Sequence, residues 1–154
     1  MRNFFGALCI IALLSGCSTL DIFEKSTFFP EHVWKTNNPC SFTFNIDDTV
    51  SLYQIYVVIR HEDAYHFNNI WLNIATKAPG DTVRNQQVNV QLANNKKGWL
   101  GTGMDDVFDH RVRITRAPVK LKKGVYSFTL QQNMREDPLL FVLNAGIRVE
   151  KQKP

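Results

Sequence analysis

The chain has 154 residues, of which 44% are hydrophobic and 21% are charged, and its formal net charge is +4. This length suits one domain with a single hydrophobic core. The basic residues are scattered apart from two short lysine clusters, at 96–97 and 120–123, whereas a nucleic-acid-binding protein would show a basic stripe with interleaved aromatic residues.

The N-terminus has the pattern of a targeting segment. An apolar run from Phe4 to Leu14 follows a single positive charge, and it is well short of the roughly 20 residues that span a bilayer. It ends in Leu-Ser-Gly-Cys, which resembles the lipobox of bacterial lipoproteins. We therefore interpret residues 1–16 as a lipoprotein signal peptide and Cys17 as the lipidated residue. The alternative is a buried cysteine at the end of an uncleaved helix.

The other two cysteines follow from this interpretation. Cys9 is removed with the signal peptide and Cys17 carries lipid, so Cys40 has no partner for a disulfide in the mature monomer. Residues 17–30 mix polar and aromatic side chains without a clear period. We expect them to form the lipidated N-terminus and a tether between the membrane and the domain.

The sequence of the remaining domain, residues 31–154, predicts a series of strands. Apolar residues alternate with polar ones over 42–46, and the aspartates at 47 and 48 predict a hairpin turn after it. The segment 52–60 is almost entirely β-branched or aromatic, as expected for a strand covered on both faces at the centre of a sheet. Further strands are predicted at 70–76, 88–92, 112–114, 125–130 and 141–149.

These patterns predict the fold class. Seven or eight strands at short spacing, with no helical stretch beyond a turn at 133–137, favour an all-β domain built as an antiparallel β-sandwich. A jelly-roll order is one arrangement of such strands. The order stays open at this point, because the sequence alone does not determine which strands pair.

One group of side chains suggests a metal site. Asp105, Asp106, Asp109 and His110 lie close together in the sequence, and His61, Asp63 and His66 are candidate distant partners. A hard cation such as calcium needs six to eight oxygen ligands. The spacing follows neither an EF-hand nor a zinc motif, so we interpret these residues as the solvated polar part of a loop and predict no metal site and no cofactor.

The sequence gives no reason to predict an enzyme. It contains neither a Gly-x-Ser-x-Gly nucleophile elbow nor a glycine-rich phosphate loop. Cys40 paired with a histidine would make a nucleophile, but its place at the start of a strand favours a small buried residue. A metal-dependent hydrolase built on Asp105, Asp109 and His110 is the least favoured hypothesis, and paired carboxylates for glycoside hydrolysis stay open.

Large aromatic side chains in the predicted loops are the best candidates for a binding surface. Tyr65, Asn68 and Trp71 lie in or beside the loop after the central strand, and Trp99 stands among three glycines. Such rings either close the end of a sandwich or bind a partner or a sugar ring. We favour the closing role for Trp71, which falls in a strand pattern, and weigh the two roles equally for Trp99.

Four separated blocks of the sequence together resemble the gliding-motility lipoprotein family GldH. The blocks are Arg60…Tyr65-x-x-Asn68…Trp71-Leu72, Gly98-Trp99-Leu100-Gly101…Asp109-His110, Gly124-x-Tyr126-x-Phe128…Gln132-x-Met134-Arg135…Leu139, and Gly146-Ile147-Arg148. The resemblance covers about the whole mature domain. It implies a non-catalytic outer-membrane lipoprotein associated with the gliding machinery and the linked type IX secretion apparatus, with other envelope proteins as partners. Cys17 is the one functional residue that it carries over.

Two function hypotheses follow. The first is a membrane-anchored, structural or interaction component of the gliding and secretion machinery. Ser18 replaces the aspartate associated with inner-membrane retention, and residues 18–21 lack a dense acidic run of the surface-export type, which favours the periplasmic face of the outer membrane. The alternative is a carbohydrate-binding surface lipoprotein that stacks sugar rings on Tyr65, Trp71 or Trp99. Neither hypothesis involves nucleic acid.

Overall fold

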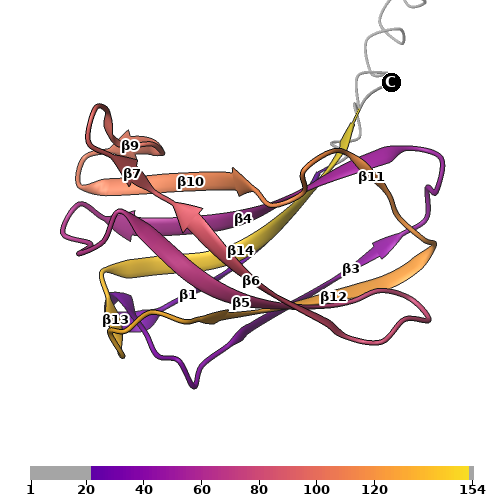
Figure 1. Ribbon diagram of the computed structural model, residues 1–154, viewed down its shortest axis with the longest axis horizontal. Helices are drawn as coiled ribbons and strands as arrows, with labels where there is room; N and C mark the ends of the chain where they lie inside the picture. Colours follow the sequence, from indigo (N-terminus) through magenta and orange to yellow (C-terminus); the bar gives the residue numbers. More distant parts are fainter. Residues whose placement is uncertain (1–21, 153–154) are drawn as a thin grey trace, which may run out of the picture.

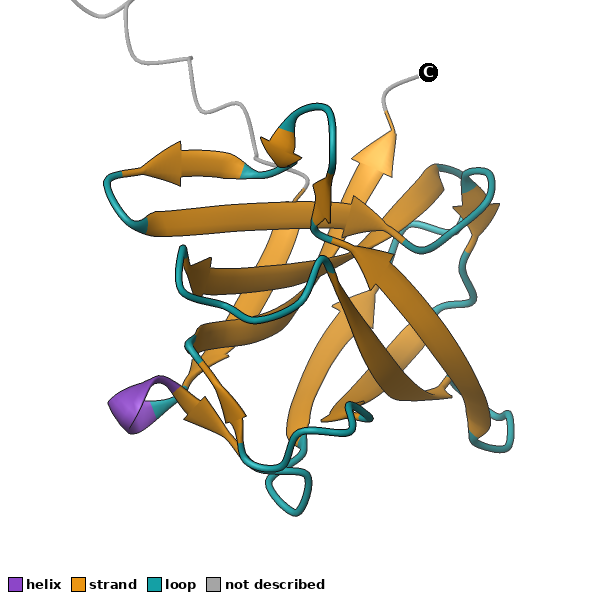
Figure 2. Ribbon diagram, turned by 60° about the vertical axis from the view of Figure 1, so that its left-hand side comes forward, coloured by secondary structure: helices purple, strands orange, loops and turns teal. Residues whose placement is uncertain are grey.

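The computed structural model describes residues 22–152, and its long elements are all β-strands. Two antiparallel sheets face each other as the layers of a sandwich (Figure 1, Figure 2), so the predicted fold class is confirmed. The helical content of these residues is one short 3-10 turn, η2 (Pro30–His32). Over the same range, no helix combines the length and the apolar character that crossing a membrane requires.

The larger sheet has six strands. They are β1 (Ile22–Phe28), β14 (Val142–Gln152), β4 (Leu52–Glu62), β10 (Val107–Arg113), β9 (Thr102–Met104) and β11 (Val119–Lys120). The order is β1-β14-β4-β10-β9, with β11 beside the start of β4. The strand predicted at 52–60 is therefore central, as expected, because β4 lies between β14 and β10.

The smaller sheet has four strands in the order β3-β12-β5-β6. They are β3 (Cys40–Ile46), β12 (Gly124–Gln132), β5 (Asn69–Lys77) and β6 (Arg84–Gln91). Two short ribbons complete the structure, and they join β2 (Val33–Trp34) to β13 (Leu139–Leu140) and β7 (Ala93–Asn94) to β8 (Gly98–Trp99).

The strand order is that of a jelly roll. Eight of the described strands have seven or more residues, and the other six have two or three. Counted along the chain, the long strands of the larger sheet stand in the order first, eighth, third and sixth, and those of the smaller sheet in the order second, seventh, fourth and fifth. This arrangement of two four-stranded sheets is the jelly roll that the sequence left open.

Alternating side chains build the core between the two sheets. In β3, each of Cys40, Phe42, Phe44 and Ile46 is buried while the residues between them are exposed. Phe44 stacks on both Tyr126 and Phe128 of β12, with ring centroids 5.4 and 5.6 Å apart. Cys40 is a free, buried thiol, as predicted, and burial raises its pKa.

The predicted tether is shorter than expected. Residues 22–28 form β1, which pairs along its whole length with β14 at the edge of the larger sheet. This strand was not predicted because Glu24, Lys25 and Ser26 interrupt the apolar alternation in the sequence. Glu24 is held on the outer face by arginines, so its charge does not oppose strand formation.

The predicted hairpin after residue 46 is also wrong. The chain does turn at Asp48, whose carboxylate accepts hydrogen bonds from the backbone N–H groups of Val50 and Ser51 at 2.8 and 3.1 Å. The turn carries the chain from one sheet to the other, because β3 pairs with β12 whereas β4 pairs with β14 and β10.

Candidate functional site

The proposed lipidation residue, Cys17, lies outside the described residues. The four candidate binding residues lie inside them and occupy two different places. Tyr65 is buried, with 5% of its surface exposed, and its hydroxyl donates to the backbone oxygen of Asn69 at 3.1 Å. Burial raises the pKa of this phenol. Tyr65 therefore supports the loop and offers no surface for a sugar ring or a partner.

Asn68 shapes the same loop through its backbone. Its carbonyl oxygen accepts hydrogen bonds from the N–H groups of Leu92 and Ala93, at 2.8 and 2.9 Å. These bonds fasten the loop before β5 to the chain that leaves β6. The Asn68 side chain is exposed.

Trp99 closes the end of the sandwich. Its ring centroid lies 4.4 Å from that of His61, and its indole N–H donates to the Asp63 carboxylate at 2.6 Å. Of the two roles weighed for Trp99, the structure supports the closing one. The ring covers a buried pair of histidines rather than facing solvent as a platform.

That pair consists of His61 on β4 and His110 on β10, which are 0% and 2% exposed. The Nδ1–H of His61 donates to the backbone oxygen of Glu62 at 2.7 Å, so its Nε2 is an acceptor. The Nε2–H of His110 donates to this atom at 2.9 Å. Burial lowers the pKa of His61, and burial together with the facing ring lowers the pKa of His110 to about 4.

The residues considered for a metal site are dispersed. Asp109 points to the outer face of the larger sheet beside Arg60, with 3.6 Å between Oδ1 and Nε, so it faces away from His110. His66 pairs with Glu136 at 2.9 Å, and Asp105 lies in an exposed turn. Within residues 22–152, no group of three or more acidic, histidine or cysteine side chains is arranged to hold a metal ion.

Trp71 lies on the outer face of the smaller sheet, which corrects the closing role favoured for it. On β5 its neighbours Ile70 and Leu72 point into the core, while the Trp71 side chain points outward and is 38% exposed. The alternation around Trp71 was read correctly from the sequence. The role was wrong because, within residues 22–152, no further layer covers the face that carries Trp71.

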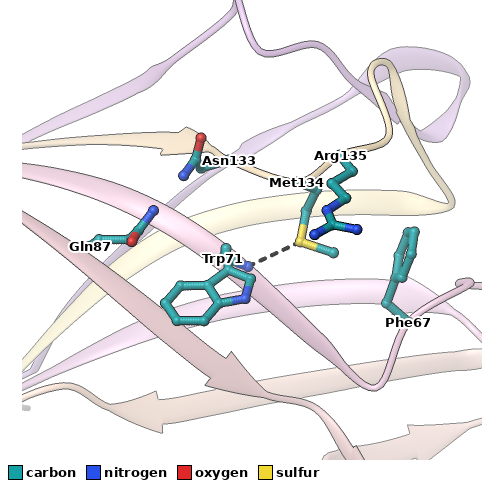
Figure 3. Close-up of a pocket in the computed structure, with 6 residues that line it drawn as sticks. All are labelled: Phe67, Trp71, Gln87, Asn133, Met134 and Arg135. Atoms are coloured by element: carbon teal, nitrogen blue, oxygen red, sulfur yellow. Dashed lines mark hydrogen bonds between the residues drawn. The ribbon is translucent and has the colours of Figure 1, made fainter.

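A hollow of about 420 Å³ lies beside this indole. Its lining comes from β5, β6, the loop before β5 and the segment after β12, and consists of Phe67, Trp71, Gln87, Asn133, Met134 and Arg135. In Figure 3 the indole lies between Gln87 on one side and Met134, Arg135 and Phe67 on the other. This volume falls in the range of about 300–1,000 Å³ typical of small-molecule sites.

Backbone contacts hold the wall of the hollow in place. The N–H of Asn133 donates to the Trp71 carbonyl at 2.8 Å, and the Trp71 N–H donates to the Met134 sulfur at 3.2 Å (Figure 3). Met134 is thereby seated next to the indole. The sequence does not point to Gln87, Asn133 or Arg135 as site residues, because Gln87 on β6 and the segment after β12 come together only through the pairing of β5 with β6 and β12.

Comparison with known proteins identifies the family. A model of the GldH lipoprotein family matches residues 21–149, which is most of the chain. The chain belongs to the GldH lipoprotein family. This is a family of gliding-motility lipoproteins, so the resemblance drawn from the four sequence blocks is confirmed.

Two relatives support the assignment over nearly the full length. The chain is 23% identical to "Gliding motility lipoprotein GldH homolog" of Christiangramia forsetii, over 98% of both chains. It is 24% identical to "Gliding motility lipoprotein GldH" of Flavobacterium johnsoniae, over 96% of both chains. Among solved structures, a chain of infectious bursal disease virus, Gx strain, matches at 11% identity and a TM-score of 0.30; this match covers 84% of the present chain and 30% of the viral one.

The sequence blocks that resemble the GldH family converge on two places in the fold. Tyr65, Trp99 and His110 meet around His61 at the end of the sandwich. Trp71, Met134 and Arg135 meet at the hollow. The first place is packed and closed by hydrogen bonds, whereas the second is open to solvent, so the hollow and the face around it form the candidate binding site.

Proposed function

We propose that this GldH-family protein is a non-catalytic interaction component of the envelope machinery for gliding motility and the linked type IX secretion. In this proposal it is acylated at Cys17 and held at the periplasmic face of the outer membrane. The observation that carries the proposal is the family match over residues 21–149. The lipobox-like sequence before Cys17 supports the part of the proposal that concerns the lipid anchor.

The geometry of the described residues supports a non-catalytic role. The histidines, which are the side chains best suited to proton transfer near neutral pH, are engaged within the protein. Both ring nitrogens of His61 are hydrogen-bonded, one to Glu62 and the other to His110, and Trp99 covers the pair. His66 is paired with Glu136 on the surface.

The anchor supplies the physical mechanism. One acyl chain holds a protein only reversibly, but burial gains about 0.8 kcal/mol per methylene, so two or three chains fix it to the bilayer. Confinement to the membrane surface raises the effective concentration of the domain near partners in the same membrane. A protein of this kind contributes by position and contact rather than by turnover.

Deletion of the gene, followed by complementation, tests the role. We expect deletion to reduce surface translocation, the secreted proteome or both, and the wild-type gene to restore the loss. Cys17→Ala should give a folded but mislocalised protein that fails to complement, and fractionation with acyl labelling checks its location. A deletion strain that spreads and secretes like the wild type would contradict the proposed function.

A second experiment tests the partner class. Crosslinking of intact envelopes, followed by pull-down of the wild-type protein, should recover other envelope proteins. The Cys17→Ala variant serves as the matched control, because it keeps every folded surface but lacks the anchor. Recovery of no envelope protein with the wild type, or of the same set with both variants, would argue against a membrane-localised interaction role.

A further inference from the structure

The two outer faces of the sandwich differ sharply in charge. The register of the larger sheet places nine charged residues on its outer face: Glu24, Arg60, Glu62, Asp109, Arg111, Arg113, Lys120, Arg148 and Glu150. Glu24 bridges two of them, at 2.8 Å from Arg111 and 2.9 Å from Arg148. The Arg111 hydrogen bond holds the pKa of the Glu24 carboxyl below its usual value. Ion pairs cover this face.

The outer face of the smaller sheet is almost uncharged. Of its sixteen residues, twelve carry amides or hydroxyls, three are apolar and one is charged. They are Ser41, Thr43, Asn45, Asn69, Trp71, Asn73, Ala75, Lys77, Asn85, Gln87, Asn89, Gln91, Val125, Ser127, Thr129 and Gln131. Charged residues make up 21% of the whole chain, so one in sixteen is a marked depletion. We call this surface the amide face.

Trp71 stands in the amide face with amides around it. Asn89 lies directly opposite on β6, and Asn73 and Gln87 form the adjacent cross-strand pair. Paired residues on one face of a sheet have Cβ atoms about 4.5–5.5 Å apart, so these side chains form one continuous surface. Among residues 22–152, the side-chain amides of Asn73, Gln87 and Asn133 have no hydrogen-bond partner, and they are available to a ligand.

This chemistry matches a sugar chain. A saccharide presents hydroxyl groups that both donate and accept hydrogen bonds, and Asn and Gln amides and Ser and Thr hydroxyls do the same. The flat apolar face of a sugar ring can pack on an indole, which combines a large apolar area with a fixed geometry. An uncharged face also avoids the cost of desolvating ionised groups, which an uncharged ligand would leave unpaired.

Other ligands fit the amide face less well. The core of a protein–protein interface is apolar and rich in aromatic residues and arginine, whereas this face has one tryptophan. A nucleic acid or an anionic polysaccharide calls for a cluster of positive charges. Lys77, at the end of β5, and Arg135, at the rim of the hollow, are single charges on separate elements.

We propose that the amide face binds an uncharged glycan chain, with one sugar ring packed on Trp71 at the hollow and the following rings along Asn73, Gln87 and Asn89. This ligand goes beyond the role in gliding and does not depend on it. Deletion phenotypes test that role, whereas glycan binding by the purified protein tests this site, so either can fail without the other.

The test is native affinity electrophoresis of the full chain in a polyoxyethylene detergent, which avoids sugar headgroups. The gels contain a β-glucan, a galactomannan, a xyloglucan, a soluble chitin oligosaccharide conjugate or, for comparison, polygalacturonate. We expect at least one uncharged polysaccharide to retard the protein. Its affinity should change less than twofold between 50 and 500 mM NaCl, which are about half and about five times the 0.1 M ionic strength at which the Debye length is about 10 Å, because salt screens contacts between charges only.

Three variants locate the binding. Trp71→Ala should weaken it roughly tenfold, a value typical of losing a stacked aromatic contact. Phe28→Ala is the matched control, because Phe28 is also a large exposed ring, 57% exposed, but lies on the larger sheet. Gln87→Ala removes an exposed amide that has no intramolecular bond within residues 22–152, so it should weaken binding several-fold without affecting folding.

Three results would overturn the proposal. One is the absence of retardation by every uncharged polysaccharide. Another is binding to polygalacturonate alone that disappears at 500 mM NaCl. The third is self-association of the wild type that Trp71→Ala and Gln87→Ala abolish without any effect on glycan binding, which would make the amide face an interface between two copies.

Discussion

The buried histidine pair should make the domain acid-sensitive well above the range in which carboxylates titrate. His110 is neutral in the folded protein because burial and the facing His61 lower its pKa from 6.5 to about 4. In the unfolded chain the same ring takes up a proton near pH 6.5. Between these two values the unfolded state binds more protons, so the free energy of unfolding must fall as the pH is lowered.

The size of the effect follows from the two pKa values. For each extra proton that the unfolded state binds, the free energy of unfolding falls by about 1.4 kcal/mol for every unit by which the pH is lowered. For His110 this amounts to roughly 2 kcal/mol between pH 7 and pH 5. His61 adds a loss of the same sign, because burial lowers its pKa too. The carboxyls of Glu24 and Glu136, whose pKa values lie below the usual 4.5, contribute little until the pH is lower still.

The assay is urea unfolding at half-unit steps from pH 7 to pH 5, followed by tryptophan fluorescence. His110→Gln keeps a donor for the His61 nitrogen but does not titrate, so it should flatten the dependence of stability on pH. Gln87→Ala is the control, because Gln87 is exposed and the change adds and removes no titratable group, so it should keep the wild-type slope. Equal slopes for the wild type and His110→Gln would refute the reasoning.

Three further predictions concern the fold. Gly146→Ala should cost roughly 1–3 kcal/mol of stability, because a Cβ there would collide with the Lys25 carbonyl of β1, and urea unfolding measures the loss. Leu130→Ala should cost about 2–5 kcal/mol as a fully buried residue, whereas Val125→Ala on the same strand, 61% exposed, should change stability by less than about 0.5 kcal/mol in the same assay. Cys40 should resist alkylation at pH 8 in the native protein and react in urea, as judged by peptide mass spectrometry, because it is buried and its thiol pKa is raised.

The sequence predicts the strands of this fold better than their partners. Alternation identified β3, β5 and β12, and a continuous β-branched run identified the central position of β4, because side-chain period and burial on both faces are local properties. Which strands pair with each other depends instead on residues that are far apart in the sequence. The turn at Asp48 has the chemistry of a hairpin, yet it carries the chain between the two sheets, because the jelly roll places β14 and β10 on either side of β4.

The candidate site was predictable only in part, for the same reason. The sequence identified Trp71 as a candidate on a strand, although with a closing role, but the amides around it become neighbours only when β5 pairs with β6 and β12. The uncharged character of the amide face is spread over four strands that are distant in sequence. Tyr65 was predicted as a binding residue and the role of Trp99 stayed open, because an aromatic residue in a loop looks the same in sequence whether its ring is packed or exposed.

The short tether determines which end of an anchored domain would face the bilayer. The chain from Cys17 to Ile22, where β1 begins, reaches at most about 18 Å, so acylation at Cys17 would hold the start of β1 close to the bilayer. Ile22 lies opposite Glu150, near the end of β14, and the register of β14 with β4 places Leu52 at this same end. Trp71 and the hollow lie toward the other end, because Gln132 at the far end of β12 pairs with Leu72. An anchor at Cys17 would therefore leave the hollow, and the part of the amide face around Trp71, accessible at the membrane-distal end.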